Sequence, residues 1–434
     1  MLRTNNKFNT PSESLIWMGC VPEDWEIKRI QECLYEINQS NSPVVTDNIL
    51  SLTNTDGVIP YNERGNQGNK AKEDLEAYKV VYENTIVANS MNILIGSVGL
   101  SKYKGCVSPV YYVYAAKEGY DVRFFNYLMR TTQFQKELRK YANGIMEIRM
   151  RVSSGDILKR KAAVPSVQEQ SEIADFLDVK CEQIDDLLRE EKSILAKLKD
   201  LKKAYISEAL THGIDGVSLK ESNLSYVDGI PENWENRKMI SLLAMRVVDG
   251  AHESPVLLDD GIPYISATAI ENGRINFDKR RGFISEEYCD ICDQRYKPQI
   301  GDILVIKLGA STGQVAIVDT DERFNIWVPL AAVRCNDSAL PKFVYYAFQA
   351  DYMIKQMELS WTFGTQETLG LKTIEGLRIL IPSVSEQKRI VEYLDKKIEE
   401  VDSLILQKEK LIETIEVYEK SLIFDLVTGK RKVV

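Results

Sequence analysis

Few residues in this 434-residue sequence have the types and spacing that catalysis or metal binding requires. Cys289 and Cys292 are spaced like zinc ligands, but a structural zinc site needs a second pair and the chain has only two histidines. Glu26 and Lys28 resemble part of a nuclease site, yet no suitably placed aspartate precedes them, and surface charge explains them better. The loop from Gly309 to Gly313 lacks the lysine of an ATP-binding loop, and motifs of S-adenosylmethionine enzymes are missing. We therefore predict no enzymatic activity and no bound cofactor or metal.

The remaining candidate sites are small polar loops that could bind a polyanion such as nucleic acid. In the second half, a short apolar run ends at Lys307 and enters a loop containing Ser311 and Thr312, whose amides and hydroxyls can approach phosphate closely. In the first half, a loop with Ser97, followed by two lysines, has the comparable place. A plain hairpin turn explains both loops equally well. The predicted phosphate contacts of this kind are Ser97, Lys102, Lys104, Lys307, Ser311 and Thr312.

Further polar turns and basic clusters add candidate contacts to nucleic acid. Amide side chains pair bidentately with adenine, which favours base reading by Asn143 and by Gln366 with its neighbour Thr365. The basic candidates are Arg149, Arg151, Lys279, Arg280 and Arg281. A solvated surface explains any one such cluster about twice as often as DNA does.

Composition limits the possible classes of protein. With 55 basic and 64 acidic side chains the net charge is −9, which argues against a histone-like binder but allows a local basic face. The seven scattered cysteines suit reduced thiols in a cytoplasm. The first residues lack an apolar signal region and no apolar stretch is long enough for a membrane span, so we expect neither secretion nor membrane insertion.

The elements that must position these residues follow an internal repeat. Pro22-Glu23-Asp24-Trp25-Glu26 recurs as Pro231-Glu232-Asn233-Trp234-Glu235. Val164-Pro165-Ser166, followed by Glu169-Gln170, recurs as Ile381-Pro382-Ser383, followed by Glu386-Gln387. Between these anchors the halves align poorly, so the chain is expected to alternate globular segment, long helix, globular segment and long helix.

The two helical segments show coiled-coil periodicity. Each begins with a possible capping box, Ser166 with Glu169 and Ser383 with Glu386. Apolar residues at alternating spacings of four and three form a seam from Leu177 and another from Leu394, each interrupted by two charges, Glu191 and Lys202 or Lys408 and Glu419. A continuous first helix would be about 65 Å long at about 1.5 Å per residue. A helical hairpin with a break at 189–193 is the alternative. The interrupting charges correspond as Glu191 to Lys408 and Lys202 to Glu419, which suits a parallel pair better than an antiparallel one.

The globular segments show the pattern of short β-strands separated by turns. Short apolar runs at Ile262–Ile265 and Ile303–Ile306 lie between Gly, Asp and Pro. Helix-like stretches follow at Arg123–Tyr141 and Lys342–Leu359. Both segments are therefore predicted to be α+β.

These motifs resemble the specificity subunits (HsdS) of type I restriction-modification systems, from about Leu15 onward. The marks are Pro-Glu-x-Trp opening each half, Gly301-Asp302-Ile303-Leu304, Gly364-Thr365-Gln366, and Pro-Ser-x-x-Glu-Gln opening each helix. In the first half Asn84-Thr85-Ile86-Val87 and Gly144-Ile145-Met146 stand where the second has Gly-Asp-Ile-Leu and Gly-Thr-Gln.

The resemblance implies an α+β chain with two target-recognition domains separated by two long helices that pack as an antiparallel coiled coil, in a pseudo-two-fold repeat. We expect a flexible segment 1–14, a first recognition domain 15–164, a helix and linker 165–225, a second domain 226–381 and a second helix 382–434. Each domain would read one half of a bipartite double-stranded DNA target.

The resemblance also implies partners. The helices would dock two methyltransferase subunits and, in the full complex, restriction subunits, with S-adenosylmethionine, ATP and Mg on those partners. Since the opening of each helix is repeated, the expected docking residues are Glu169, Gln170, Ile173, Leu177, Glu386, Gln387, Ile390 and Leu394. The alternative is a coiled-coil adaptor whose two domains bind proteins and not DNA.

Overall fold

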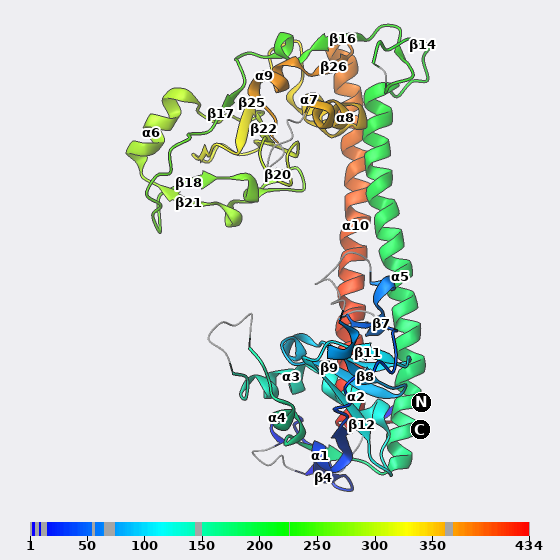
Figure 1. Cartoon of the computed structure of the whole chain (residues 1–434). Helices are drawn as coiled ribbons and strands as arrows, with labels where there is room; N and C mark the ends of the chain where they lie inside the picture. The colour runs from blue at the N-terminus through cyan, green and yellow to red at the C-terminus, as the bar shows by residue number, and fades with distance from the viewer. Residues whose placement is uncertain are drawn as a thin grey trace. The chain divides into compact units, whose positions relative to one another are not determined.

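The computed structural model describes residues 2–4, 8–9, 15–53, 57–64, 74–143, 150–224, 226–360 and 368–433. Contacts divide the chain into two compact units, Met1–Lys192 with Lys410–Val434, and Ser193–Glu409. Each unit contains one α+β domain and one section of a pair of long helices, α5 and α10 (Figure 1).

The long helices are continuous, with α5 spanning Val167–Thr211 and α10 spanning Val384–Val427. The alternative of a hairpin broken at 189–193 is therefore wrong. In the second unit Lys199 Nζ lies 3.0 Å from Glu409 Oε1 and Lys202 Nζ lies 2.6 Å from Asp402 Oδ1. Numbers fall along α10 as they rise along α5, so the helices are antiparallel, as predicted.

The predicted seam is the buried face of this pair. In the first unit Leu177 and Leu188 of α5 and Leu422 of α10 are buried, and in the second unit Leu394 and Val401 of α10 are buried. One of the charges that suggested a parallel pair, Lys202, instead forms an ion pair with Asp402 of α10. The sequence alone could not predict this pairing, because which residues face each other in an antiparallel pair depends on where each helix begins and ends.

The domain of the first unit has a four-stranded antiparallel sheet in the order β10-β9-β12-β5. Two helices and a short third helix follow, and strand β13 then pairs with β4. The bounds are β4 Glu26–Arg29, α1 Ile30–Cys33, β5 Leu34–Glu36, β9 Thr85–Asn89, β10 Val98–Ser101, β12 Tyr111–Ala116, α2 Val122–Arg130, α3 Thr132–Arg139, α4 Ser154–Leu158 and β13 Lys161–Val164.

The domain of the second unit has the same arrangement, with an antiparallel sheet in the order β17-β25-β22-β23. Helices follow here too, and β26 then pairs with β16. The bounds are β16 Glu235–Lys238, β17 Val248–Asp249, β22 Ile303–Ile306, β23 Val315–Ile317, β25 Leu330–Val333, α7 Pro341–Gln349, α8 Asp351–Ser360, α9 Leu371–Gly376 and β26 Arg378–Ile381.

The repeat thus includes the fold of the two domains as well as the sequence motifs that begin and end them. Strands β9 and β22 both lie inside their sheets, although the motifs on them share little sequence. The domains differ in what is inserted before these strands. The first has β6 Leu50–Leu52, β7 Val58–Pro60 and β8 Lys79–Val81, with β11 Gly105–Val107 after β10, whereas the second has β18 Ile262–Ile265, β19 Ile270–Glu271, β20 Arg274–Ile275, β21 Gly282–Ile284 and α6 Glu286–Arg295, with β24 Asn325–Ile326 after β23.

Each unit has its own apolar core. In the second unit Trp234, Phe343 and Phe348 pack with residues of both long helices, which include Leu210 and Ile390. A further cluster in this unit fills the space around the sheet. In the first unit a cluster that includes Val87 and Val113 packs on the sheet. The second domain is therefore attached to the long helices through buried apolar contacts.

The remaining short strands lie at the ends of the chain and after α5. Strand β1 pairs antiparallel with β27, β2 with β3, and β14 with β15. Their bounds are β1 Leu2–Thr4, β2 Phe8–Asn9, β3 Val21–Pro22, β14 Leu219–Lys220, β15 Ile230–Pro231 and β27 Arg431–Val433. Among the described residues no helix combines the length and apolar composition needed to cross a membrane.

Candidate nucleic-acid interface

The two halves of each repeated motif meet in space. The strand after Pro-Glu-x-Trp pairs with the strand before Pro-Ser, with Arg29 opposite Lys161 in the first unit and Lys238 opposite Arg378 in the second. This ladder brings together the start and end of each domain at the first turn of its long helix. We call the contacts around it the domain joint.

The tryptophan of each motif contributes to the joint through the helix glutamate. Trp234 Nε1 donates a hydrogen bond to Glu386 Oε1 at 2.9 Å, and Asn233 Nδ2 donates to Glu386 Oε2 at 3.0 Å. In the first unit the Trp25 side chain also hydrogen-bonds Glu169. The serine half of each predicted capping box is confirmed, since the Glu169 amide donates to Ser166 Oγ at 3.3 Å and the Glu386 amide to Ser383 Oγ at 3.4 Å.

The glutamine of each motif is buried and binds backbone groups. Gln387 Oε1 accepts from the Leu340 amide at 2.8 Å, and its Nε2 donates to the carbonyls of Ser338 and Pro382, each at 3.0 Å. Gln170 does the same in the first unit, accepting from the Asp121 amide and donating to the Pro165 carbonyl, both at 2.9 Å. Each glutamine thus satisfies the amide just before the helix pair of its domain.

A repeated aspartate adds a third element to the joint. Tyr127 Oη donates to Asp178 Oδ1 and Tyr346 Oη donates to Asp395 Oδ1, both at 2.7 Å. A cation accompanies each pair, Arg123 in the first unit and Lys342 in the second. Burial and the neighbouring carboxylate raise the pKa of both tyrosines, so both hydroxyls remain hydrogen-bond donors.

The residues expected to dock partners therefore lie in the joint. Six of them are buried, which are Gln170, Ile173, Leu177, Gln387, Ile390 and Leu394, while Glu169 and Glu386 are partly buried. Their polar atoms and apolar surface are used inside the chain. Sequence reasoning could not distinguish the two roles, because a repeated surface and a repeated internal joint produce the same repeated letters.

The candidate DNA contacts of the second domain differ in accessibility. Lys307 is buried, and its Nζ lies 2.9 Å from Oδ2 of the buried Asp249. Burial alone would raise the pKa of Asp249, but Lys307, with Arg295 and His252, lowers it. Lys307 is thus an internal ion-pair partner, which the sequence did not indicate because Asp249 is distant along the chain.

The other loop residues of this domain are at the surface. Ser311 and Thr312 lie half-buried in the hairpin between β22 and β23, and Gly309 and Gly313 at its ends have positive φ angles of 98° and 91°. The Leu369 amide donates to the Lys307 carbonyl at 2.9 Å. This places the end of the loop that contains Thr365 and Gln366 beside the hairpin, although those two residues lie outside the described part of the chain.

The first domain shows a comparable pairing of loops. Asn143 and Arg151 are exposed and joined by two backbone hydrogen bonds of 2.9 Å, and the Val152 amide donates to the Ser90 carbonyl at 3.1 Å. Ser97 is buried beside Gly96, whereas Lys102 and Lys104 are exposed in the turn after β10. Arg149 lies outside the described residues. In each domain the loop that joins an inner strand to an edge strand, β9 to β10 or β22 to β23, is hydrogen-bonded to the segment that leads out of the turn after the helix pair.

The basic cluster of the second domain is partly engaged. Lys279 forms an ion pair with Glu271. The Arg280 guanidinium lies 4.1 Å from the ring of Phe283, and that of Arg281 lies 3.2 Å from the ring of Trp327. Such stacking leaves a guanidinium partly desolvated, so these side chains are less free than the sequence suggests.

The other chemical motifs have structural surroundings. Cys289 and Cys292 are buried in α6, and burial raises the pKa of the Cys289 thiol to about 11. Glu26 and Lys28 form an ion pair of 2.8 Å on β4. Within the described ranges no three His, Cys, Asp or Glu side chains are grouped to hold a metal ion.

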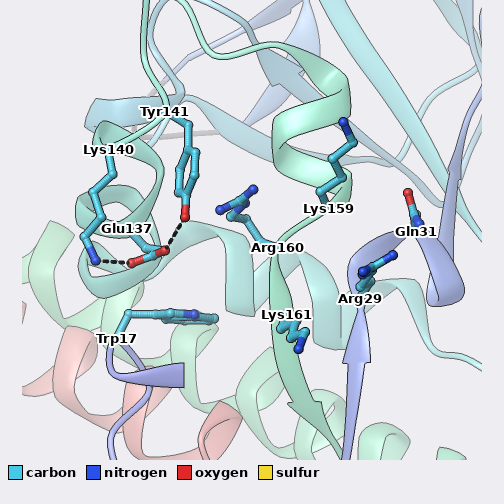
Figure 2. Close-up of a pocket in the computed structure, with 9 residues that line it drawn as sticks. All are labelled: Trp17, Arg29, Gln31, Glu137, Lys140, Tyr141, Lys159, Arg160 and Lys161. Atoms are coloured by element: carbon cyan, nitrogen blue, oxygen red, sulfur yellow. Dashed lines mark hydrogen bonds and ion pairs between the residues drawn. The ribbon is translucent and has the colours of Figure 1, made fainter. Parts of the chain in front are cut away.

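A basic pocket in the first unit was missed by the sequence reasoning. Figure 2 shows Arg160 between Tyr141 and Lys159, with Lys161 and Arg29 beside them. The pocket has a cavity volume of about 480 Å³. A signal existed in the uninterrupted run Lys159-Arg160-Lys161, but the partners from β4 and the end of α3 became apparent only in the fold.

Known proteins share this sequence pattern and fold. The family model of the type I restriction modification DNA specificity domain matches residues 22–199 and 231–416. A putative type I restriction enzyme MjaX specificity subunit from Methanocaldococcus jannaschii is 22% identical, with 96% of each chain covered, and the MjaVIII specificity subunit from the same organism is 24% identical, covering 95% of this chain and 94% of the relative.

A solved chain from a study of assembly and conformational transition of the type I R-M system has a TM-score of 0.68 at 16% identity, covering 94% of this chain and 99% of that one, and supports the fold. Because the family model matches both halves, it favours the DNA role over the protein adaptor, and neither half belongs to a nuclease. The chain therefore belongs to the type I restriction-modification DNA specificity family, as the non-catalytic DNA specificity subunit of such a system.

Proposed function

We propose that the subunit recognises an asymmetric, interrupted DNA target, with one half-site read by each domain. The observation that supports this proposal is that both domains have the same scaffold but different loops. The sheets share one strand order and the joints share their hydrogen bonds, whereas the inserted segments and loop residues differ. Two different recognition surfaces on one scaffold suit two unlike half-sites.

Loop residues that are exposed or half-buried are the favoured DNA contacts. In the first domain these are Lys102, Lys104, Asn143 and Arg151, and in the second Lys279, Ser311 and Thr312, with Thr365, Gln366 and Arg149 retained from the sequence. Ser97 and Lys307 are better assigned to supporting their loops, because both are buried. Arg280 and Arg281 retain a role only if DNA competes with their ring contacts.

The experiment for this proposal is sequencing of adenine methylation in cells that carry the subunit and its partners. One gapped motif should be present, and deletion of this chain should abolish it. Exchanging residues 307–314 for the corresponding loop of a relative should change one half of the motif only. Unchanged methylation after deletion would refute the proposal, and a change in both halves would refute the assignment of one half-site to each domain.

We also propose that the long helices dock two methyltransferase subunits, and through them restriction subunits, with S-adenosylmethionine, ATP and Mg bound by those partners. A repeated exposed stripe supports this. Leu187, Ile194 and Leu201 follow each other every seven residues on α5, and their counterparts in the repeat are Leu404, Leu411 and Tyr418 on α10. Leu187, Leu201 and all three counterparts are exposed, with 40% to 50% of their surface accessible. A stripe that occurs twice suits two copies of one partner.

Leu404→Asp tests this docking. Because the side chain is exposed, the substitution should leave the melting temperature unchanged and reduce the methyltransferase copies per subunit from two to one, as measured by native mass spectrometry. Leu406→Asp is the control, since Leu406 is 68% exposed and its counterpart in the repeat is Arg189. Two bound copies with Leu404→Asp, or a loss confined to Leu406→Asp, would refute this stripe.

A further inference from the structure

The pocket in the first unit concentrates positive charge in an acidic chain. Arg29 extends from β4, Lys140 from the end of α3, Lys159 and Arg160 from the segment joining α4 to β13, and Lys161 from the start of β13. Glu137 is the acidic residue of the lining, and Lys140 neutralises it with an Nζ to Oε2 distance of 2.6 Å. The other four cations therefore determine the sign of the potential in the pocket.

These four cations have no ion-pair partner among the residues that the structure describes. Arg160 is held in place by other means. Its guanidinium lies 3.4 Å from the ring centre of Tyr141, and its Nε donates to the Asp156 carbonyl at 2.8 Å. The stacked ring and the Nε bond fix the plane of the guanidinium, which favours recognition of an oxyanion.

The second domain provides an internal comparison. Its joint has the same ladder, with Lys238 at the place of Arg29 and Arg378 at the place of Lys161. The residues just before the last strand differ, because the Ile30 amide donates to the carbonyl of Arg160, whereas the Met239 amide donates to that of the buried Leu377. The scaffold is therefore built without this guanidinium in one copy, so Arg160 and Lys159 are not required for the ladder.

The position of the pocket indicates which anion it meets. Tyr141, which forms one wall, is two residues before Asn143, where the loop closed by Asn143 and Arg151 begins. This is the turn assigned to DNA in the first domain. A cavity of about 480 Å³ is much larger than the roughly 30 Å³ of one water molecule and admits a hydrated phosphodiester.

We propose that this pocket binds backbone phosphate of the DNA beside the half-site read by the first domain, and that the second domain has no equivalent. The inference rests on the proposed DNA function. The lysines and arginines supply charge-assisted hydrogen bonds to phosphate oxygens, which set the position of the domain without reading sequence. The two domains therefore hold DNA unequally, with the first more sensitive to salt.

The test compares Arg29→Gln/Lys161→Gln with Lys238→Gln/Arg378→Gln in the subunit assembled with its methyltransferase. Both variants remove two charges from the same pair of ladder positions. Loss of two phosphate contacts should reduce the slope of log K against log salt by about 1.8, and weaken binding roughly 30-fold near 0.15 M salt. The control pair should change neither. Lys159→Gln, outside the ladder, should reduce the slope by about 0.9.

The outcomes separate the two proposals. A wild-type complex that shows no salt-dependent DNA binding overturns the proposed function itself. Normal wild-type binding with unchanged slopes for Arg29→Gln/Lys161→Gln and Lys159→Gln overturns only the pocket. Failure of these variants to assemble with the methyltransferase, while the control pair assembles normally, would identify the pocket as a protein contact and overturn the proposal. Competition by millimolar inorganic phosphate, without a change of slope in the variants, would identify a free-phosphate site and also overturn it.

Discussion

Replacement of Gln387 by alanine is the sharpest test of the domain joint. The side chain is completely buried and makes three hydrogen bonds, with the Leu340 amide at 2.8 Å and the carbonyls of Ser338 and Pro382 at 3.0 Å. Leaving a buried amide unsatisfied costs about 1–3 kcal/mol. With the two lost donor bonds we expect about 3 kcal/mol in total. For a unit of this size that lowers the melting temperature by about 6–12 °C.

The assay is thermal unfolding of the full chain, followed through the second unit by hydrogen exchange of peptides that contain Leu340. Gln407→Ala is the matched control, because Gln407 is exposed on the same helix and bonds only weakly to Ser403 Oγ at 3.4 Å. Its melting temperature should not change. If Gln387→Ala melts like the wild type but fails to bind the methyltransferase, Gln387 is a docking residue and the joint interpretation is refuted.

Two further predictions follow from the same contacts and from the buried ion pair. Trp234→Phe removes the indole donor to Glu386 while keeping most of the apolar packing, and should lower stability by about 1.5–3 kcal/mol, since the acceptor is charged; an unchanged calorimetric melting temperature would contradict the role of this bond. Lys307→Met removes one of the cations paired with the buried Asp249 and leaves Arg295 in place, so it should destabilise the second unit by about 1.5–3 kcal/mol at neutral pH. Because the folded-state pKa of Asp249 is depressed, the stabilisation by Lys307 is present above the ordinary aspartate pKa of about 4 and is lost as pH falls through the lower folded-state value. Denaturation curves of variant and wild type should therefore converge in acid, and a gap that is constant with pH would argue against the pair.

The repeat allowed much of the architecture to be predicted from the sequence. The periodicity from Leu177 and Leu394 correctly indicated two long helices, and the runs Ile262–Ile265 and Ile303–Ile306 are strands β18 and β22. Each expected helix at the end of a domain is a pair, α2 with α3 and α7 with α8, since Asp121 and Thr131 cap separate helices in the first domain. These elements could be predicted locally because the secondary-structure propensities of their residues agree with the spacing of their apolar side chains.

The roles of individual residues were harder to predict. Gln387 and Lys307 have polar side chains that the sequence alone places equally well on a surface, and their burial depends on Leu340 and Asp249, which are distant along the chain. The common topology of the two sheets could not be predicted either, because a strand requires apolar residues at its buried positions but does not require the same residues in both copies. The lining of the pocket around Arg160 comes from four separate segments of the chain, so composition could not reveal it.

The ladder between the first and last strand of each domain makes that domain an exchangeable cassette. Both splice points, near Glu26 and Val164 or near Glu235 and Ile381, lie in segments whose contacts are the same in the two copies. Recombination between such segments can insert a new domain without disturbing the helix that follows. Exchange of one domain therefore leaves both long helices of the chain unchanged.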